Sequence, residues 1–415
     1  MSAAKRRVPS RAGPRNDGVD AARLRAWWWR RQGLDGSLAG ASARDVLLRS
    51  GWARSVGGVG PYLALFSRAR LSRAAIDQAV AGASIHELPS ARGCTYVLPS
   101  DDFGLGLLVG APFAEAPLRP ARSLGVTEAE IETLCRAVVK AVGAAPLDPE
   151  AIRAATGKAS RSLGEAGKKK GVTTTLPLAL GLLQSRGEIR RVPTNGRLDQ
   201  QRYAYVRWAP NPLKTTPFKT ADALTELARR YFRWIGPATV KEFQAFAGCG
   251  VKAAQAAVTP LALEEIMANR GLLLLPEDVE AFHGFRAPAK PQYALVSGLD
   301  TLLLARRDLG SLIDAEDAQR QLLGERNLLT IGGLSELPYH AILDRGRVVG
   351  LWEFDTETAT IAWMTFGRSD AAMRRAVSET EAFVRDELGD ARTFSLDSPA
   401  SRSPRIAWLR SVAAV

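Results

Sequence analysis

Apolar and polar residues follow a helical period through most of residues 151–210 and a strand period at their end. The runs LDPEAIRAATG (147–157) and VTTTLPLALGLLQSRGEI (172–189) each predict a helix, and the basic run EAGKKKG (165–171) predicts a turn between them. An Asn-Gly turn at 195–196 then separates two strand-like runs, which is a strong signal for a β-hairpin. Helix, turn, helix and hairpin is the order of a winged helix.

The same order recurs on both sides of this segment. Residues 220–285 contain three helical runs, and Gly236 ends the first while Pro237 begins the second. The run GLLLLPEDVEAFHGF that follows them is predicted to form the wing. The first part of the chain has helical runs at DAARLRAWWWRRQG, SARDVLLRSGW and LSRAAIDQAVAG and a hairpin at IHELPSARGCTYVLP. We therefore predict three tandem winged-helix domains, over residues 18–115, 116–212 and 213–288.

Three consecutive tryptophans, Trp27, Trp28 and Trp29, lie in the first of these helical runs. Successive residues of a helix point about 100° apart, so three neighbours cannot all face one core. We expect them to be buried between neighbouring domains. The alternative is that at least one of them faces DNA.

From Pro291 onward the pattern changes to the two-residue period of β-strands. The runs QYALVSG, YHAILDRGRVVGLWEFD and ATIAWMTF predict strands that short turns connect. An amphipathic helix at DAAMRRAVSETEAFVRDELG is expected to pack on them, and PRIAWL (404–409) predicts a last strand. The chain as a whole is predicted to be α+β, with three winged helices followed by a C-terminal β-barrel with a helix over residues 289–415.

Charge is distributed unevenly along the 415 residues, whose formal net charge is +13. Residues 1–210 carry 32 basic against 17 acidic side chains, and residues 151–210 alone carry 12 against 3. A one-sided positive field of this kind attracts polyanions, so double-stranded DNA is the first candidate partner. The alternative is a solvated basic surface without a partner. Three tandem domains in one chain suffice to grip a duplex, so we expect a monomer.

Composition indicates a folded protein of the cytoplasm. Apolar residues make up 46% of the chain, yet no apolar run reaches the roughly 18 residues of a membrane helix, so no membrane partner is expected. Residues 1–17 lack the apolar core of a secretory signal and are predicted to form a disordered basic arm. The three cysteines are scattered, which favours reduced thiols over a zinc module.

Four stretches of the chain resemble a known protein family. They are ARGCTYVLPSDDF (91–103), ARRYFRWIGPATVKEFQAFAG (228–248), VSGLDTLLLARRD (296–308) and HAILDRGRVVGLWEF (340–354). With these motifs in register, the sequence resembles the AlkZ-like, YcaQ-related DNA glycosylases, a bacterial winged-helix superfamily. The resemblance implies removal of alkylated or crosslinked bases from DNA, chiefly N7-substituted purines, in a nucleoid-associated setting. It also implies that no metal or other cofactor takes part.

The stretch SVGGVGPY (55–62) lies where this family carries a catalytic polar pair. The pair is Gln-x-Gln or Gln-x-Asp in a Val-Gln-x-Gln-x-Pro context, and its side-chain oxygens orient a water molecule. With Val56 and Pro61 aligned, Gly57 and Val59 occupy the two positions, and neither has a polar side chain. The catalytic residues therefore stay unassigned. Two hypotheses remain, a glycosylase with a rearranged site and a non-catalytic DNA-binding protein or regulator.

The glycines in this stretch have two further interpretations. They lack the spacing and the Lys-Ser/Thr pair of a nucleotide-binding loop, so a nucleotide site is excluded. A tight turn between helices and a nest of backbone amides for a DNA phosphate both remain.

Other polar residues are weaker candidates for chemistry. His86 and Glu87 stand at the first hairpin, either close to a DNA channel or on a surface edge of the hairpin. Asp101 and Asp102 follow Ser100 at a helix start, where capping and the helix dipole account for acidic residues.

DNA-binding side chains are predicted in the second winged helix. A basic turn precedes the helix that would enter a groove, threonines stand at the start of that helix, and arginines flank the wing. Phosphate contacts of this kind give affinity without reading the sequence. The predicted DNA-binding residues are Lys168, Lys169, Lys170, Thr173, Thr174, Arg190, Arg191 and Arg197.

Overall fold

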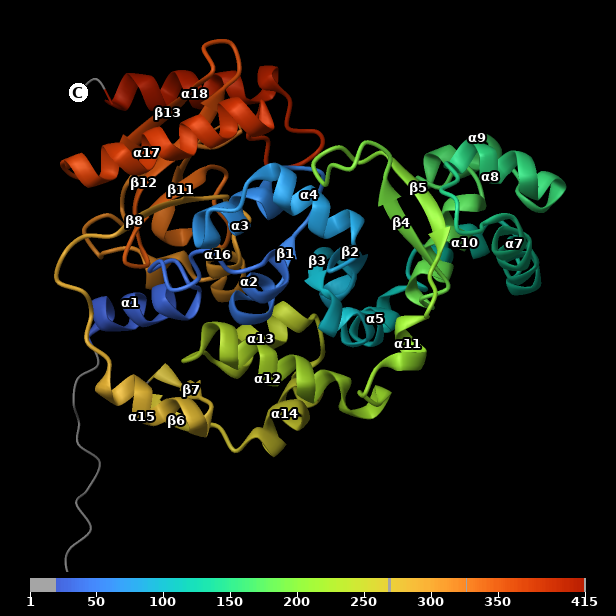
Figure 1. Ribbon diagram of the computed structural model, residues 1–415, viewed down its shortest axis with the longest axis horizontal. Helices are drawn as coiled ribbons and strands as arrows, with labels where there is room; N and C mark the ends of the chain where they lie inside the picture. The colour runs from blue at the N-terminus through green and yellow to red at the C-terminus, as the bar shows by residue number, and fades with distance from the viewer. Residues whose placement is uncertain (1–19, 268–269, 326, 414–415) are drawn as a thin grey trace, which may run out of the picture.

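The computed structural model describes residues 20–267, 270–325 and 327–413 (Figure 1). The predicted basic arm over residues 1–17 lies outside the described residues. An order of helix, short strand or single bridge, two or three helices and hairpin occurs three times along the chain. We call these segments the first unit (43–99), the second unit (128–207) and the third unit (223–274).

The first unit is built around a three-stranded antiparallel sheet of order β1-β3-β2. Ser42 and Ser72 begin two of its helices, because each hydroxyl accepts a backbone N–H of the first turn. Its elements are α2 (Ala43–Ser50), β1 (Ala53–Arg54), α3 (Gly60–Ala69), α4 (Arg73–Ala81), β2 (Ile85–Pro89) and β3 (Thr95–Pro99).

The second unit follows the same order, with one change from the prediction. The run expected to be a basic turn contains a short helix, α9, in which Lys168 pairs with Glu165 one turn earlier. A single bridge between Leu147 and Tyr205 takes the place of the first strand. Its elements are α7 (Glu128–Ala141), α8 (Pro149–Thr156), α9 (Gly164–Lys169), α10 (Leu176–Ser185), β4 (Ile189–Pro193) and β5 (Tyr203–Arg207).

The third unit has a bridge between Ala238 and Leu273 as its first strand pairing. Its predicted wing is wrong beyond Leu274, because Pro276 begins a helix that carries Glu277 and Asp278 in its first turn. Its elements are α12 (Ala223–Ile235), α13 (Val240–Ala247), α14 (Val251–Val258), β6 (Glu264–Met267) and β7 (Leu272–Leu274), and α15 (Pro276–Gly284) follows it.

The C-terminal part is a sheet of order β13-β12-β11-β8, antiparallel throughout. Among the described residues its edge strands β8 and β13 do not pair, so the sheet is open and the predicted β-barrel is wrong. The α+β class is confirmed. Two helices lie over this sheet in Figure 1. These elements are β8 (Tyr293–Val296), β11 (His340–Asp344), β12 (Arg347–Asp355), β13 (Thr360–Thr365), α17 (Ala371–Phe383) and α18 (Pro399–Ala413).

The predicted last strand at PRIAWL is also wrong, because these residues belong to α18. Ile406 and Leu409 are buried and stand three positions apart, which is the spacing of one helical face. The described elements outside the three units and this sheet are short. They are α1 (Ala21–Arg31), α5 (Phe103–Gly110), α6 (Leu118–Arg122), α11 (Pro212–Thr215), α16 (Thr301–Arg306), β9 (Gln321–Leu323) and β10 (Leu328–Thr330).

Helix α1 joins the third unit to the C-terminal sheet through its three tryptophans. All three are buried, and their indole N–H groups donate to the carbonyl oxygens of Gly236 (2.8 Å) and Pro237 (3.1 Å) and to Gln292 Oε1 (3.2 Å). A buried indole needs such an acceptor. Burial of the tryptophans between neighbouring parts of the chain is therefore confirmed.

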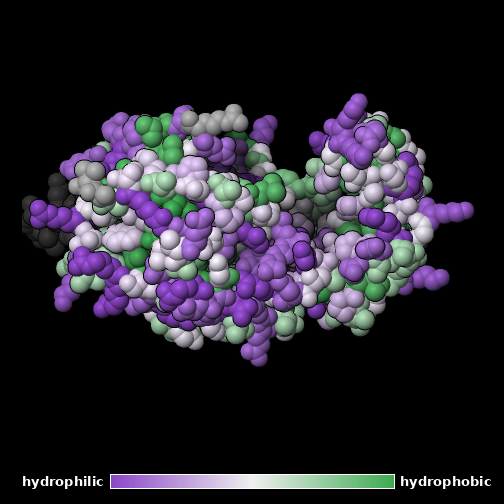
Figure 2. All heavy atoms as spheres, turned by 90° about the horizontal axis from the view of Figure 1, so that it is seen from above, coloured by the Kyte–Doolittle hydropathy of each residue, from purple (hydrophilic) through white to green (hydrophobic). Residues whose placement is uncertain are grey.

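The second unit forms a lobe with an apolar core of its own, whereas the other two units share theirs with the C-terminal part. Figure 2 shows a notch between this lobe and the rest of the molecule, with hydrophilic side chains projecting from the lobe. The hairpin β4–β5 connects the two sides, since Leu198 in its tip donates its backbone N–H to Tyr62 Oη at 3.0 Å. Among the described helices, none combines the length and apolar character of a bilayer crossing.

Candidate nucleic-acid site

The glycine stretch, residues 55–60, is held by a segment close to the C-terminus. Val59 donates its backbone N–H to the carbonyl oxygen of Arg392 at 2.9 Å, and Ser395 donates to that of Val56 at 3.1 Å. A Cβ atom on Gly58 would overlap the carbonyl group of Thr393, so only glycine permits this approach. The stretch is thus a tight, close-packed turn.

The tip of the hairpin β4–β5 packs against the other side of the glycine stretch. Gly57 has φ +77°, in the left-handed region, and a Cβ atom there would lie 2.5 Å from Cγ of Gln201. The guanidinium of Arg392 binds both sides, since it donates to the carbonyl oxygens of Gly57 (3.1 Å) and Asp199. Three distant segments therefore meet at Gly57.

Positions 57 and 59, which the resemblance aligns with the family's polar pair, have different surroundings. The side chain of Val59 is 1% exposed and belongs to the apolar core between α2, α3 and the C-terminal sheet. Position 57 faces Gln201 instead of a core. A polar side chain would therefore be isolated from water at position 59 and would collide with the hairpin at position 57.

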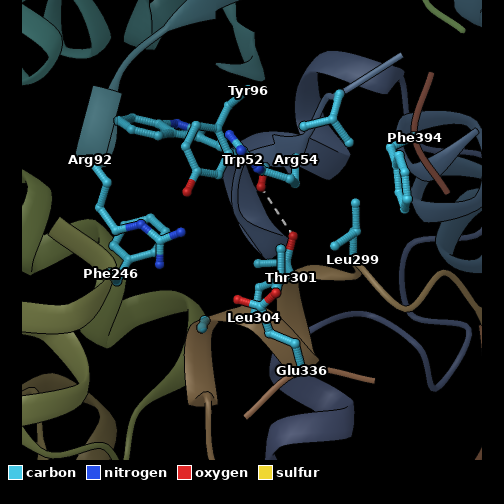
Figure 3. Close-up of a pocket in the computed structure, with 12 residues that line it drawn as sticks. Trp52, Arg54, Arg92, Tyr96, Phe246, Leu299, Thr301, Leu304, Glu336 and Phe394 are labelled. Carbon is cyan, nitrogen blue, oxygen red and sulfur yellow. Dashed lines mark hydrogen bonds between the residues drawn. The ribbon is translucent and has the colours of Figure 1, made fainter. Parts of the chain in front are cut away.

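A pocket of about 240 Å³ lies beside the glycine stretch, where the first unit, the third unit and the C-terminal part meet (Figure 3). In this view Arg92 and Phe246 lie on one side of the pocket, Phe394 lies on the other, and Glu336 lies below. The threonine hydroxyl of Thr301 donates to the carbonyl oxygen of Trp52 at 3.1 Å and closes the floor. The residues that line the pocket include Trp52, Arg54, Val56, Arg92, Tyr96, Phe246, Leu299, Glu336 and Phe394.

Aromatic rings and two arginines give this pocket its chemistry. Tyr96 is buried, which raises the pKa of its hydroxyl to about 12, and the Arg54 guanidinium lies 5.4 Å from its ring centre. Arg92 adopts φ +58°, which turns the chain sharply at the Arg-Gly step. Glu336 is exposed and pairs with Arg307 at 3.0 Å. Such a lining suits a flat ring of nucleobase size.

Glu87 and Arg191 tie the first unit to the second behind the glycine stretch. The carboxylate of Glu87 accepts the Ser55 hydroxyl at 2.5 Å and pairs with Arg191 at 3.1 Å. Arg191 also lies over the ring of Tyr203, 4.4 Å from its centre. Glu87 is 3% exposed, so its expected place on a surface hairpin edge is wrong.

His86 is buried beside Glu87, so the surface position is wrong for this residue too. Its ring packs against Phe103 and Trp208, at centroid distances of 5.8 and 5.0 Å. Burial lowers the pKa of His86 to about 3, and the nearby arginines of β4 act in the same direction. The ring is therefore neutral at physiological pH and serves the apolar contact between the two units.

The expected capping role of Asp101 and Asp102 is wrong. Asp101 pairs with Arg44 at 2.6 Å, and Asp102 is buried, where it accepts the Trp52 indole N–H at 2.9 Å and pairs with Arg230 at 2.9 Å. Helix α5 begins at Phe103 without a side-chain cap. The carboxylate of Asp102 is instead bonded to the buried indole of Trp52 and to Arg230 of α12. Leaving these buried groups unpaired would cost more free energy than a local helix cap provides.

Five of the predicted DNA-binding residues lie together on the lobe. The lysines are exposed at the end of α9, where Lys168 pairs with Glu165 and Lys170 donates to Ser123 Oγ at 2.6 Å. Helix α10 buries all five of its leucines, so the surface at this end of the lobe is formed by the residues that precede the helix. The five residues are Lys168, Lys169, Lys170, Thr173 and Thr174.

The other three predicted residues, Arg190, Arg191 and Arg197, lie on the hairpin and not beside the lysines. Burial lowers the pKa of Arg190, although it stays a cation at neutral pH, and Arg191 pairs with Glu87. Arg197 pairs with Asp199 at 2.5 Å and donates to the carbonyl oxygen of Leu388 at 3.0 Å. The structure therefore divides the predicted set into an exposed group and a junction group.

The comparisons with known proteins agree with this architecture. The model of the family described as DNA glycosylase AlkZ-like matches residues 59–394, most of the chain. Among solved structures, the Streptomyces sahachiroi DNA glycosylase AlkZ is similar, with a TM-score of 0.65 and 19% sequence identity over 90% of this chain and 98% of that one. No protein with curated annotation matches in sequence. At this identity the structural likeness shows the fold.

Proposed function

The chain belongs to the AlkZ-like DNA glycosylase family, and from this premise we propose that it binds double-stranded DNA and hydrolyses the N-glycosidic bonds of N7-alkylated or crosslinked purines. The observation that carries the proposal is the aromatic pocket, which lies beside the stretch that we align with the family's catalytic motif. The biological role that follows is repair of, or resistance to, alkylated DNA.

We assign DNA binding to the basic lobe and the notch beside it. Residues 151–210 carry 12 basic against 3 acidic side chains, and the lysines of α9 are exposed. Contacts with phosphates give sequence-independent affinity, which suits an enzyme that meets lesions in any sequence. We take each unit as a winged-helix domain, with boundaries at 18–115, 116–212 and 213–288, in a chain that acts as a monomer.

The pocket suits the leaving base. Its volume of about 240 Å³ is smaller than the roughly 300–1,000 Å³ of most ligand pockets, so it accommodates one base and not a whole nucleotide. Trp52, Tyr96 and Phe246 contribute buried aromatic rings to its wall, and Phe394 adds an exposed ring on which a base can stack.

An apolar side chain at the mouth of the pocket suits the gap that a displaced base leaves. Phe394 is 42% exposed, and Leu396, two residues later, is 84% exposed. Side chains of this kind insert between base steps in other DNA-binding proteins. We assign Phe394 and Leu396 this role.

Incubation with a duplex that contains N7-methylguanine tests the proposal directly. We expect release of the free base and formation of abasic sites. Phe394→Ala should slow release about 5- to 150-fold, because loss of one stacked ring costs about 1–3 kcal/mol. Leu328→Ala, which also removes an exposed apolar side chain but lies on β10 outside the pocket lining, is the matched control and should leave release unchanged.

A second function is favoured by one observation, the absence of a polar side chain at Gly57 and Val59. In that case the chain recognises DNA without cleaving the glycosidic bond and acts as a lesion binder or regulator. Duplex binding without any release of base would establish this function in place of the first.

A further inference from the structure

We propose that Gln201, from the tip of the hairpin β4–β5, orients the attacking water in place of the side chain that is missing at position 57. This inference rests on the proposed function. The water-orienting side chain would then come from the second unit, whereas the resemblance places it in the first unit, at residues 55–62.

The direction of the Cα–Cβ bond at position 57 carries the argument. A Cβ atom built on Gly57 would lie 2.5 Å from Cγ, 2.6 Å from Cδ and 2.9 Å from Nε2 of Gln201. A side chain that started at residue 57 would therefore enter the space that the Gln201 amide fills. Glycine at 57 and glutamine at 201 are complementary, and a glutamine at 57 would exclude the one at 201.

The hairpin tip is fixed on both sides of Gln201. Before it, Leu198 donates to Tyr62 Oη at 3.0 Å, and Arg392 binds the carbonyl oxygen of Asp199. After it, the ring of Tyr203 is covered by Arg191, which in turn pairs with Glu87. A catalytic group needs such support to hold a productive position.

The amide of Gln201 is available to a water molecule. Within residues 20–267, 270–325 and 327–413, the Gln201 side chain forms no hydrogen bond, and the residue is exposed. The Gln201 amide lies against residue 57, which directly follows Val56 of the pocket lining. An exposed amide without a protein partner has an oxygen that accepts from water and a nitrogen that donates.

The chemistry requires orientation and no strong base. As the bond between C1′ of the sugar and the purine nitrogen breaks, its electron pair moves into the purine and neutralises the alkylated ring. The water oxygen forms the new bond to C1′, and its proton passes to bulk solvent. Gln201 Oε1 accepts a hydrogen bond from this water and points its lone pair at C1′, which carries positive charge in the transition state.

The matched pair Gln201→Ala and Gln200→Ala tests the inference. Gln200 is the neighbouring exposed glutamine, and its Oε1 accepts from Asn195 Nδ2 at 2.6 Å within the tip. With saturating protein and a duplex containing N7-methylguanine, we expect Gln201→Ala to lower the single-turnover rate about 100-fold. The Kd for the duplex and the Tm should stay unchanged. Gln200→Ala should keep the full rate, and Gln201→Glu should recover part of it.

The possible outcomes separate the two proposals. If the wild-type protein releases the base and Gln201→Ala does so at the rate of Gln200→Ala, the inference about Gln201 is overturned and the proposed function stands. If the wild-type protein binds the duplex and releases nothing, the proposed function fails and the inference fails with it. A loss confined to Gln201→Ala supports both.

Discussion

The lobe of the second unit and the junction around residues 55–60 differ in what their unusual residues do. On the lobe, Lys168, Lys169 and Lys170 project into solvent, so their function depends on their charge and on little around them. At the junction, Gly57 and Gly58 allow three distant segments to come together, so their function depends on what they leave out. A charged surface tolerates substitution of its side chains, whereas a position at which two backbones touch does not tolerate a larger residue.

The largest effect is expected from glutamines at positions 57 and 59, which the resemblance aligns with the family's polar pair, because this change acts on the junction itself. Gly57→Gln with Val59→Gln should lower the free energy of unfolding by about 4 kcal/mol, because one amide would be buried without a partner and the other strained at positive φ. Base release should not increase. Urea unfolding and the release assay measure the two effects, and a stable, more active double variant would contradict this account of the junction.

Gly58→Ala tests the same region with a single methyl group. We expect a loss of about 2–3 kcal/mol in the free energy of unfolding, since the methyl would meet the backbone of Thr393, which cannot turn aside like a side chain. Gly181→Ala in α10 is the control, because a Cβ there meets nothing within 4 Å and alanine favours a helix. Equal stability of the two variants would show that the segment at 392–395 moves freely.

The fold also shows which structural features the sequence pattern predicts and which it does not. Periodicity predicted the helices and hairpins, and the α+β class is confirmed because each element depends on residues close in the chain. The β-barrel was wrong because closure depends on whether β8 and β13 meet, which no local pattern encodes. Residues 404–409 are predicted as a strand but belong to α18, because the short apolar run IAWL (406–409) fits both periods.

The candidate site was less predictable than the fold. Basic side chains at the surface are recognised from composition alone, which is why the lysines of the lobe were found. The contact between Gly57 and Gln201 joins residues far apart in the chain, and no sequence pattern around either residue predicts it. Arg92 lies in the stretch at 91–103 that carries the family resemblance, yet its place in a pocket wall depends on Phe246 from another unit. Whether the eight predicted residues bind DNA stays a prediction.

The pH dependence of the free energy of unfolding tests the contact between the lobe and the junction, where His86 is buried. Burial lowers the pKa of His86 to about 3, so between pH 6.5 and 3 the unfolded chain binds a proton that the folded chain does not. Stability should therefore fall as the pH drops below 6.5, by about 2 kcal/mol for this group at pH 5. His86→Leu should remove that part of the slope.

Other buried groups act on the same pH range, so the difference between the two proteins is the quantity to measure. His340, whose pKa burial lowers to about 4, adds a loss of the same sign. Glu353, whose pKa burial raises to about 7, acts in the opposite sense, because the folded chain holds its proton as the pH falls from 7 to 4.5. Parallel stability curves for the wild-type protein and His86→Leu would contradict the assignment.

Replacing the three lysines of α9 has the smallest effect on folding and tests the other half of the comparison. We expect the variant Lys168→Ala, Lys169→Ala, Lys170→Ala to keep the wild-type free energy of unfolding, since these side chains are exposed and Lys168 has only a surface ion pair. Its affinity for duplex DNA should fall roughly 10-fold at 0.15 M salt, equally for all sequences.

The matched control for this prediction replaces Lys241, Lys252 and Lys290, which are exposed on other parts of the chain. Both variants lose three charges, so a difference between them reports position and not net charge. The salt dependence should decrease by roughly one to three counterions for the α9 variant and stay unchanged for the control. Equal slopes for the two variants would mean that DNA does not contact α9, and the basic lobe would then be a solvated surface.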